Sequence, residues 1–179
     1  MRNLEIATLV SLDGVVSDPQ SWAEPYFDAE AANHSLEVLQ AADAFLMGRG
    51  SYDYFAPTWS TGEGPYMGRL REMPKYVFSS TLEHADWDNT HVVPGDAIEA
   101  VRELKAGHGG DLVAYGYGAF SQALLEHDLV DKLTFYIHPI VVATGTPVFR
   151  PGKAKRLRLL HSQARSTGVV GVSYGREEA

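Results

Sequence analysis

The stretch from Asp111 to Phe149 constrains the fold of this chain more than any other part of the sequence. It begins with a short apolar run at 112–115 and breaks at Gly116-Tyr117-Gly118. Apolar residues at helical spacing follow from Phe120 to His127, and β-branched and aromatic residues then fill 134–142. Two strands joined through a helix usually lie parallel, so this order predicts a βαβ unit. A glycine turn that opens a helix can hold a phosphate on free backbone N–H groups, and we therefore expect half of a nucleotide cofactor site at this turn.

The glycine spacing of this turn differs from the standard dinucleotide-binding fingerprint. That fingerprint is G-x-G-x-x-G, and Ser121 stands where its third glycine would be. The sequence therefore predicts phosphate binding at a turn that lacks the standard Rossmann pattern.

Composition narrows the class of protein. A chain of 179 residues suits one domain, residues 1–179, with a continuous core, and its 45% apolar and 21% charged residues are ordinary for a globular protein. The net charge of −8 argues against a protein that tracks nucleic-acid phosphates. The absence of cysteine excludes disulfides and Cys-ligated zinc, and the seven histidines show no metal-ligand spacing, so no metal site is predicted.

The N-terminal residues do not have the pattern of a secretory or membrane segment. Glu5 and Asp13 interrupt the first apolar run too early for a secretory signal. No apolar run approaches the ~20 residues of a membrane span. We therefore expect a cytoplasmic protein with no membrane partner.

The rest of the chain alternates between strand-like and helix-like segments. Strands are predicted at 3–10, 44–47, 75–79 and 91–93, and a hairpin at 157–165 and 169–176 around Ser166-Thr167-Gly168. Helices are predicted at 25–42, 52–55, 67–73 and around 98–104, with a loop at 56–65. Strands interleaved with helices, followed by an antiparallel hairpin, indicate a mixed sheet with helices on its faces.

Small or hydroxyl-bearing turns follow four of the predicted strands. Ligands of open α/β sheets bind in the crevice beyond the carboxyl ends of the strands. A single turn of this kind is more often a plain connection, but four of them after successive strands favour a shared site. The turns are Ser11–Gly14, Gly48–Ser51, Ser79–Thr81 and Gly116–Gly118.

Several motifs together resemble a known family. They are Ser11–Gly14, Leu46–Tyr52, Lys75–Leu82, Gly116–Gly118, Leu129–Leu133 and Pro139–Val141, in this order over nearly the whole chain. The chain resembles the dihydrofolate reductase-like superfamily, and specifically the reductase domain of the bifunctional riboflavin-biosynthesis deaminase/reductase and its stand-alone relatives. The resemblance implies a three-layer α/β/α fold, with a mixed, mostly parallel sheet of about eight strands and a C-terminal antiparallel hairpin. It also implies an NADPH site, hydride transfer to a small heterocycle and a homodimer, for which the apolar C-terminal third would provide the seam.

The resemblance implies cofactor contacts from three of the turns. Gly48, Arg49 and Ser51 open a helix, where N–H groups and a guanidinium suit phosphates. Ser79, Ser80 and Thr81 would surround the adenosine ribose. Many relatives have arginine in place of Ser80, and a hydroxyl does not supply that charge, so the sequence does not predict selectivity for the 2′-phosphate. Facing the pyrophosphate would be Gly116, Tyr117, Gly118, Ala119 and Phe120.

The backbone at Tyr117 is a separate prediction. Family members usually have a small residue at the middle of this turn, where a cis peptide occurs. A non-proline cis bond costs roughly 3–4 kcal/mol and needs surrounding contacts to enforce it. We predict a cis Gly116–Tyr117 bond; the alternative is that Tyr117 is a rim aromatic with an ordinary backbone.

The substrate side of the site is less constrained by the sequence. The resemblance implies Asp28 and Glu30 as candidates for a catalytic acid, because dihydrofolate reductases use a buried carboxylate on the first helix. It also implies Asp13, which matches a strand-end acid of the riboflavin-type relatives and would border the nicotinamide. Equally, Asp13 would cap its own turn, and Asp28 and Glu30 would favour a helix N-terminus. Aromatic faces stack on heterocycles. Four aromatic residues are candidates for the walls of a flat substrate pocket, or alternatively for side chains that fill the core: Trp22, Tyr26, Phe55 and Trp59.

The sequence therefore predicts an NADPH-dependent reductase of a small pteridine- or pyrimidine-like heterocycle, with NADH or a flavin as open alternatives for the cofactor. The first alternative function is a non-catalytic nucleotide-binding or regulatory protein on the same fold, since a fold does not dictate an activity. The others are a purely structural domain and a true dihydrofolate reductase.

Overall fold

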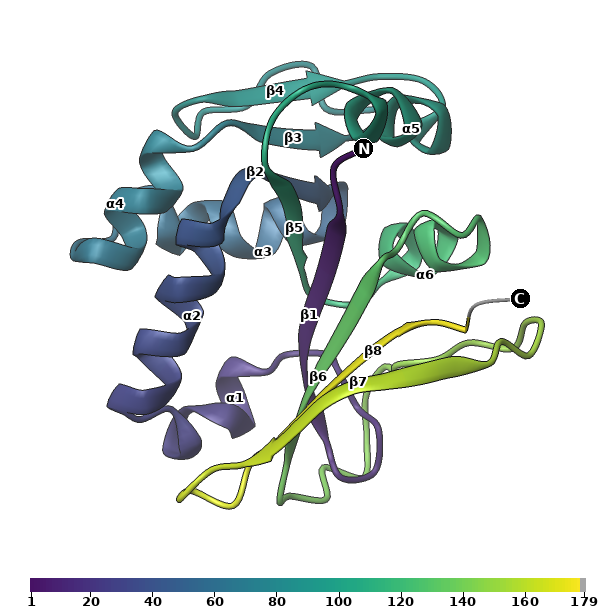
Figure 1. Cartoon of the computed structure of the whole chain (residues 1–179). Helices are drawn as coiled ribbons and strands as arrows, with labels where there is room; N and C mark the ends of the chain where they lie inside the picture. The colour runs from purple at the N-terminus through teal and green to yellow at the C-terminus, as the bar shows by residue number, and fades with distance from the viewer. Residues whose placement is uncertain (178–179) are drawn as a thin grey trace.

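A single eight-stranded sheet organises the computed structural model, which describes residues 1–177 (Figure 1). Its strands lie in the order β4-β3-β2-β5-β1-β6-β8-β7. The strands are β1 (Leu4–Ser11), β2 (Ala42–Gly48), β3 (Lys75–Phe78), β4 (Thr90–Val93), β5 (Asp111–Tyr115), β6 (Lys132–His138), β7 (Leu157–Ala164) and β8 (Val170–Arg176). The helices are α1 (Gln20–Ala23), α2 (Ala29–Ala41), α3 (Arg49–Trp59), α4 (Pro65–Glu72), α5 (Ala97–Ala106) and α6 (Ala119–Glu126), with a 3-10 turn at Glu24–Tyr26.

The sheet is mixed, and most of it is parallel. The strands β4, β3, β2, β5, β1 and β6 run parallel to one another. β8 runs antiparallel to both of its neighbours, β6 and β7, and it forms the predicted C-terminal hairpin with β7. The expected mixed, mostly parallel sheet is therefore confirmed.

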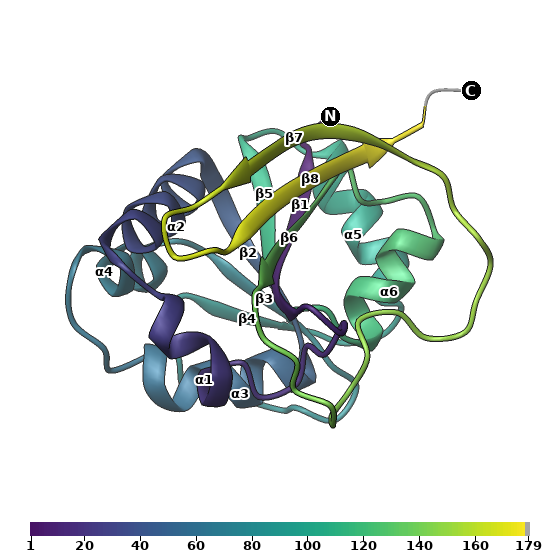
Figure 2. The same ribbon diagram turned by 90° about the horizontal axis from the view of Figure 1, so that it is seen from below.

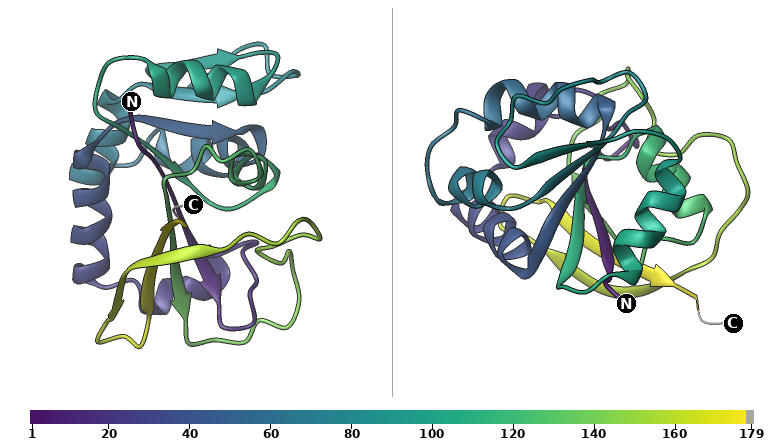
Figure 3. Two further views of the ribbon diagram at one scale, coloured as in Figure 1. Left: turned by 45° about the vertical axis from the view of Figure 1, so that its right-hand side comes forward. Right: turned by 90° about the horizontal axis from the view of Figure 1, so that it is seen from above.

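Helices cover both faces of the sheet, which gives three layers (Figures 2 and 3). On one face, here called the α5/α6 face, Ile6 and Leu46 pack with Val101 of α5 and Leu124 of α6. On the other, the α2–α4 face, Phe45 packs with residues of α2, α3 and α4. Strands buried on both sides read as continuous apolar runs rather than alternating ones, and this pattern had predicted interior strands. Among the described residues, no helix is both long enough and apolar enough to cross a bilayer.

Two helix boundaries differ from the sequence prediction. The helix predicted from Pro25 begins instead at Ala29, because Asp28 is extended and its carboxylate accepts the Ala31 N–H as an N-cap. The helix predicted at 52–55 runs from Arg49 to Trp59 and includes Pro57. Pro57 is tolerated in the last turn of α3, where the rings of Phe55 and Trp59 stack with centroids 4.0 Å apart.

The last parallel strand is shorter than the predicted run at 134–142. β6 ends at His138, and the chain beyond it turns through Ala143, whose φ is +67°. The Asp13 carboxylate accepts the N–H groups of Val142 (3.1 Å) and Ala143 (2.8 Å), so these residues bond to a side chain instead of a neighbouring strand.

A buried ion pair holds the opposite, amino edge of the sheet. Lys105 of α5 is only 4% exposed, and its ammonium donates to the Leu129 carbonyl (2.8 Å) and to the Asp131 carboxylate. Asp131 also accepts the Leu4 N–H (2.8 Å) and a guanidinium N–H of Arg176 (2.7 Å). One carboxylate thus connects α5, the start of β1 and the end of β8.

Candidate functional site

The carboxyl edge of the sheet has a topological switch point between β2 and β5. These two strands are neighbours, but the chain leaves β2 toward β3 on one side and leaves β5 toward β6 on the other (Figure 1). The helices that follow, α3 and α6, pack on opposite faces of the sheet. A switch point of this kind is where open α/β sheets bind their ligands.

The two glycine turns at this point contact each other's helices. A Cβ on Gly48 would lie 2.7 Å from Phe120 Cβ, so this position accepts only glycine without displacement of α6. A Cβ on Gly116 would lie 3.7 Å from the Ser51 hydroxyl oxygen. The turns predicted separately from the sequence are therefore brought together by the fold.

The helices at the switch point begin without side-chain caps. Gly48 is the N-cap of α3 and Gly118 is the N-cap of α6, and neither glycine has a side chain that could cap the first N–H groups of its helix. The first N–H groups of a helix have no partner within the helix, and they carry the positive end of its dipole. Next to Gly118 there is room for a ligand, because a Cβ built there meets no atom within 4 Å. Two sets of N–H donors at one edge suit a diphosphate.

A third turn joins this edge through Arg49. The Arg49 Nε donates to both oxygens of Asp53 (2.7 and 2.8 Å), and its Nη1 lies 3.5 Å from the Thr81 hydroxyl. Ser79 Oγ accepts the N–H groups of Thr81 (3.2 Å) and Leu82 (3.0 Å), which holds that turn in shape. Ser80 is exposed. Arg49, Ser79 and the glycine turns therefore lie along one edge, as the cofactor hypothesis requires.

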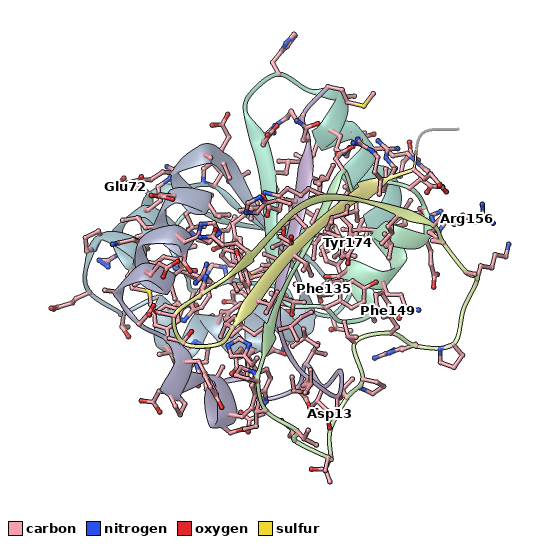
Figure 4. All side chains as sticks on the ribbon, turned by 60° about the horizontal axis from the view of Figure 1, so that its bottom comes forward. Asp13, Glu72, Phe135, Phe149, Arg156 and Tyr174 are labelled. Carbon is pink, nitrogen blue, oxygen red and sulfur yellow. The ribbon has the colours of Figure 1, made fainter. Side chains whose placement is uncertain are left out.

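Tyr117 differs from both sequence expectations. The described chain contains no cis peptide bond, so the prediction of a cis Gly116–Tyr117 bond is wrong. Gly116 makes the turn with a φ of +83°, and the Tyr117 side chain is buried rather than at a rim. Its ring packs on Phe135 and on Phe149 of the loop after β6, two residues that lie side by side in Figure 4. Burial raises the pKa of Tyr117 to about 12, and the backbone is the part of this residue available to a ligand.

The Asp13 carboxylate connects the loop after the carboxyl end of β1 with the loop after β6. Besides the N–H groups of Val142 and Ala143, its carboxylate accepts the Ser11 hydroxyl proton at 2.6 Å. The Ser11 hydrogen bond, followed by those from Ala143 and Val142, lowers the pKa of Asp13 to about 2. A carboxylate that is ionised and bonded in this way is a poor proton donor at neutral pH.

We expect acid to release this connection. The folded pKa of Asp13 lies below its ordinary 3.8, so its contribution to stability is present above that value and is lost as the pH falls toward about 2. The protection factors of the Val142 and Ala143 amides, which compare observed exchange with the intrinsic rate at each pH, should fall over this range. Asp13→Ala should exchange fast at every pH, whereas Asp88→Asn, at an exposed aspartate, should behave as wild type. Equal protection of both amides in Asp13→Ala would contradict the assignment.

The other two candidate acids lie at the start of α2. Asp28 is its N-cap, and Glu30 is exposed in its first turn. Both positions suit acids that complement the positive end of the helix dipole. A catalytic role for Asp28 or Glu30 stays a prediction.

The candidate substrate residues lie on the α2–α4 face. Trp22 packs edge-on against His138 with centroids 5.3 Å apart, as does Tyr26 at 5.6 Å. Trp59, stacked on Phe55, contacts Tyr115 of β5 edge-on at 6.4 Å. We call the aromatic residues that the sheet and these helices contribute to this face the aromatic wall: Trp22, Tyr26, Phe55, Trp59, Tyr66, Tyr115, Tyr136 and His138.

Sequence reasoning missed one contact on this wall. His34 of α2 and Tyr136 of β6 form a hydrogen bond of 2.9 Å between Nε2 and the hydroxyl oxygen. From the sequence, Tyr136 is expected with Ile137 and Val141 at a dimer seam or in the monomer's own core. Period-two alternation along β6 places it on the face opposite Phe135, and that signal was available, but its helical partner was not.

The chain is similar in sequence or in fold to several known proteins. YyaP of Bacillus subtilis (strain 168), described as uncharacterized, is 28% identical over 144 residues, which cover 77% of this chain and 76% of YyaP. A Shewanella sp. PV-4 structure, provisionally named as a riboflavin biosynthesis protein, superposes with a TM-score of 0.79 at 20% identity, covering 98% of this chain and 99% of the other.

A third comparison involves a longer protein. The Thermotoga maritima diaminohydroxyphosphoribosylaminopyrimidine deaminase/5-amino-6-(5-phosphoribosylamino)uracil reductase superposes with a TM-score of 0.70 at 14% identity, and the match covers 98% of this chain and 56% of the other. These structural likenesses support the fold. The family model of the RibD C-terminal domain matches residues 2–171. The chain therefore belongs to the RibD C-terminal domain family.

Proposed function

We propose that this protein is an NAD(P)H-dependent reductase that transfers hydride to a small heterocyclic substrate of the pteridine or pyrimidine kind. The observation that carries the proposal is the meeting of the uncapped N-termini of α3 and α6 at the switch point between β2 and β5. Membership of the RibD C-terminal domain family and the reductase name of the Thermotoga relative support the reaction class.

The order of the strands suggests how a dinucleotide would lie. Its pyrophosphate would rest on the first N–H groups of α3, after Gly48, and of α6, after Gly118. Its adenosine would extend over the end of β3, where Ser79 and Thr81 lie, and its nicotinamide over the ends of β1 and β6. When bound, the cofactor supplies the hydride, and the chain's own residues orient it against a flat substrate and exclude water. Trp22 is buried against His138, so the half-buried members of the aromatic wall, Phe55 and Trp59, would be the stacking partners of such a substrate.

Titration with NADPH and NADH tests the proposal directly. We expect saturable quenching of tryptophan fluorescence, followed by NADPH oxidation when the acceptor is 7,8-dihydrofolate, a dihydropteridine or 5-amino-6-(5-phosphoribosylamino)uracil. Absence of binding of either nucleotide below ~1 mM, which corresponds to only about −4 kcal/mol, would refute the proposal.

Arg49→Gln should weaken NADPH binding about tenfold, or about 1.4 kcal/mol. The guanidinium lies between α3 and Thr81 and remains 42% exposed, so a phosphate can reach it. Isothermal titration would measure the change, with NADH as a second ligand to separate a pyrophosphate contact from a 2′-phosphate contact. Arg102→Gln is the matched control, because Arg102 forms a similar helix-surface pair with Glu99 on α5. Equal NADPH affinities for Arg49→Gln and wild type would show that Arg49 does not contact the cofactor.

One observation favours the alternative of a non-catalytic nucleotide-binding protein. The Asp13 carboxylate is hydrogen-bonded and its pKa is lowered, the Asp28 carboxylate caps α2, and Glu30 is exposed, so each of the three acids has a structural explanation. That alternative predicts tight nucleotide binding with no NADPH oxidation by any acceptor of the panel.

A homodimer is also part of the proposal. The edge strand β7 is almost wholly exposed and carries Leu159 (53% exposed) and Leu160 (43%), and an apolar edge of this kind tends to pair. Sedimentation equilibrium would measure the mass in solution. A cytoplasmic location likewise stays a prediction.

A further inference from the structure

His34 of α2 and Tyr136 of β6 form a helix-to-sheet hydrogen bond of 2.9 Å between titratable side chains on the aromatic wall. His34 lies in the middle of α2, and its side chain is 43% exposed. Tyr136 is half-buried on β6, and its hydroxyl has no other hydrogen bond in the described part of the chain. The pair is therefore within reach of a bound molecule, and its hydroxyl retains bonding capacity.

The pair also lies on the nicotinamide side of the proposed cofactor site. Tyr136 is level with Leu9 of β1, two residues closer to the carboxyl edge than the Ala7–Tyr115 pair of β1 and β5. Only β1 separates β6 from β5, whose end carries the Gly116 turn. A ring that extends from this turn over the α2–α4 face would have Tyr136 beside it.

We propose that Tyr136 is the catalytic proton donor of the reduction and that His34 is a positioning residue that orients the Tyr136 hydroxyl and returns its proton. This inference rests on the proposed reductase function. In the step, a C–H bond forms from the NADPH hydride, and the π pair of the substrate C=N or C=O bond moves to its heteroatom. The heteroatom takes the Tyr136 hydroxyl proton, and the imidazolium of His34 reprotonates the phenolate. The sum is substrate, NADPH and one proton from water giving reduced substrate and NADP⁺.

The charges around Tyr136 suit this role. Burial, followed by the nearby Glu5 charge, raises the pKa of Tyr136 to about 12, so the hydroxyl stays protonated at working pH. The guanidinium carbon of Arg165 lies 5.1 Å from the centroid of the Tyr136 ring. A cation over the ring stabilises the negative charge that develops on the oxygen during transfer. The Tyr136 hydroxyl therefore carries its proton before the reaction, and Arg165 stabilises the phenolate that forms when the proton is donated.

The surroundings of His34 fix the expected pH dependence. Tyr136 and Lys132 face it from β6, Glu5 from β1, Arg165 from the β7–β8 turn, and Glu37 from its own helix. Burial and then Arg165 lower the pKa of His34 below its ordinary 6.5. The acid form of the imidazole returns the proton, so turnover should fall as the pH rises through this lowered pKa.

Tyr136→Phe tests the donor, and His34→Gln tests the positioning residue. Tyr136→Phe should lower kcat by about 10²-fold, the lower end of general-acid catalysis, with the NADPH dissociation constant within twofold of wild type. His34→Gln should lower kcat less and should remove the pH dependence below 6.5 that the wild type shows. The acceptor is whichever compound of the panel above the wild type reduces.

Two matched variants control for structural damage. Tyr174→Phe makes the same change on β8, on the opposite face of the sheet with Phe135 and Leu133. His91→Gln changes an exposed histidine on β4. Both should retain wild-type rates and pH profiles.

The outcomes separate the two proposals. NADPH binding and reduction with an unaffected Tyr136→Phe variant would overturn the donor assignment and leave the reductase standing. Loss of rate in Tyr136→Phe with intact NADPH binding, together with a flattened profile in His34→Gln, would support it. A wild type that does not bind NADPH, or binds it and reduces no acceptor, would overturn the reductase proposal and the donor with it.

Discussion

Gly118→Ala should weaken NADPH binding at least tenfold while the protein stays folded. The backbone at Gly118 has a φ of −125°, which alanine adopts without strain, and a Cβ there meets no protein atom within 4 Å. The new methyl group would stand in the space that the proposed pyrophosphate occupies beside the first N–H groups of α6. The methyl group would keep the pyrophosphate from approaching the backbone closely. A tenfold loss of NADPH affinity corresponds to about 1.4 kcal/mol of binding free energy.

The stability of this variant separates a blocked site from a damaged fold. Alanine is a poorer N-cap than glycine, so the free energy of unfolding should fall by about 1 kcal/mol at most. Gly68→Ala in α4 is the matched control, because a Cβ there also meets nothing within 4 Å. It should raise stability by about 0.5–1 kcal/mol and leave NADPH binding unchanged. Wild-type affinity in Gly118→Ala would place the dinucleotide elsewhere.

Asp131→Asn should lower the free energy of unfolding by about 3 kcal/mol, the low end for breaking a buried ion pair. The substitution leaves the ammonium of Lys105, 5% exposed, without its counter-charge. It also weakens the bonds to the Leu4 N–H and to Arg176. For a chain of this length, a change of 3 kcal/mol corresponds to a fall in melting temperature of roughly 6–12 °C, measurable by calorimetry.

Asp128→Asn is the matched control for the Asp131 prediction. Asp128 belongs to the same loop and pairs with Lys155, but its side chain is 69% exposed. Asparagine also tolerates the positive φ of 59° at this position. Exposed pairs contribute about 0–1 kcal/mol, so the melting temperature should change little. Similar losses in the two variants would mean that burial of Lys105 does not decide the energetics.

The fold was predictable because its signals are local. Apolar runs on both sides of 4–10 and 112–115 predicted interior strands, and the turn after each strand predicted where the carboxyl edge lies. In a parallel sheet the carboxyl ends of all strands share one edge. Gly48 and Gly116 could therefore be assigned to one site from positions 68 residues apart in the chain, as 116 − 48.

Side-chain partners were not predictable in the same way. Asp13 was one of three candidate acids, but its carboxylate bonds to amides 129 and 130 residues away, and no local pattern encodes that loop. The bond between His34 and Tyr136 depends on how α2 docks against the sheet as well as on the register of β6 beside β1. At Tyr117 the expected glycine turn is present, but the expected cis peptide bond is not. Tertiary packing decided each of these positions.

β5 also has a consequence for how the chain assembles. β5 lies between β1 and β2, which form no hydrogen bonds with each other. In the order of synthesis, however, it follows β1, β2, β3 and β4. A nascent chain that stops before Asp111 therefore has two unpaired strand edges facing the gap between β1 and β2, and such edges invite aggregation. Closing long-range parallel pairs is intrinsically slow. Insertion of the five residues of β5 closes the gap between β1 and β2 and, in the same event, carries Gly116 to Ser51, so the proposed nucleotide site and the parallel part of the sheet should form together during refolding.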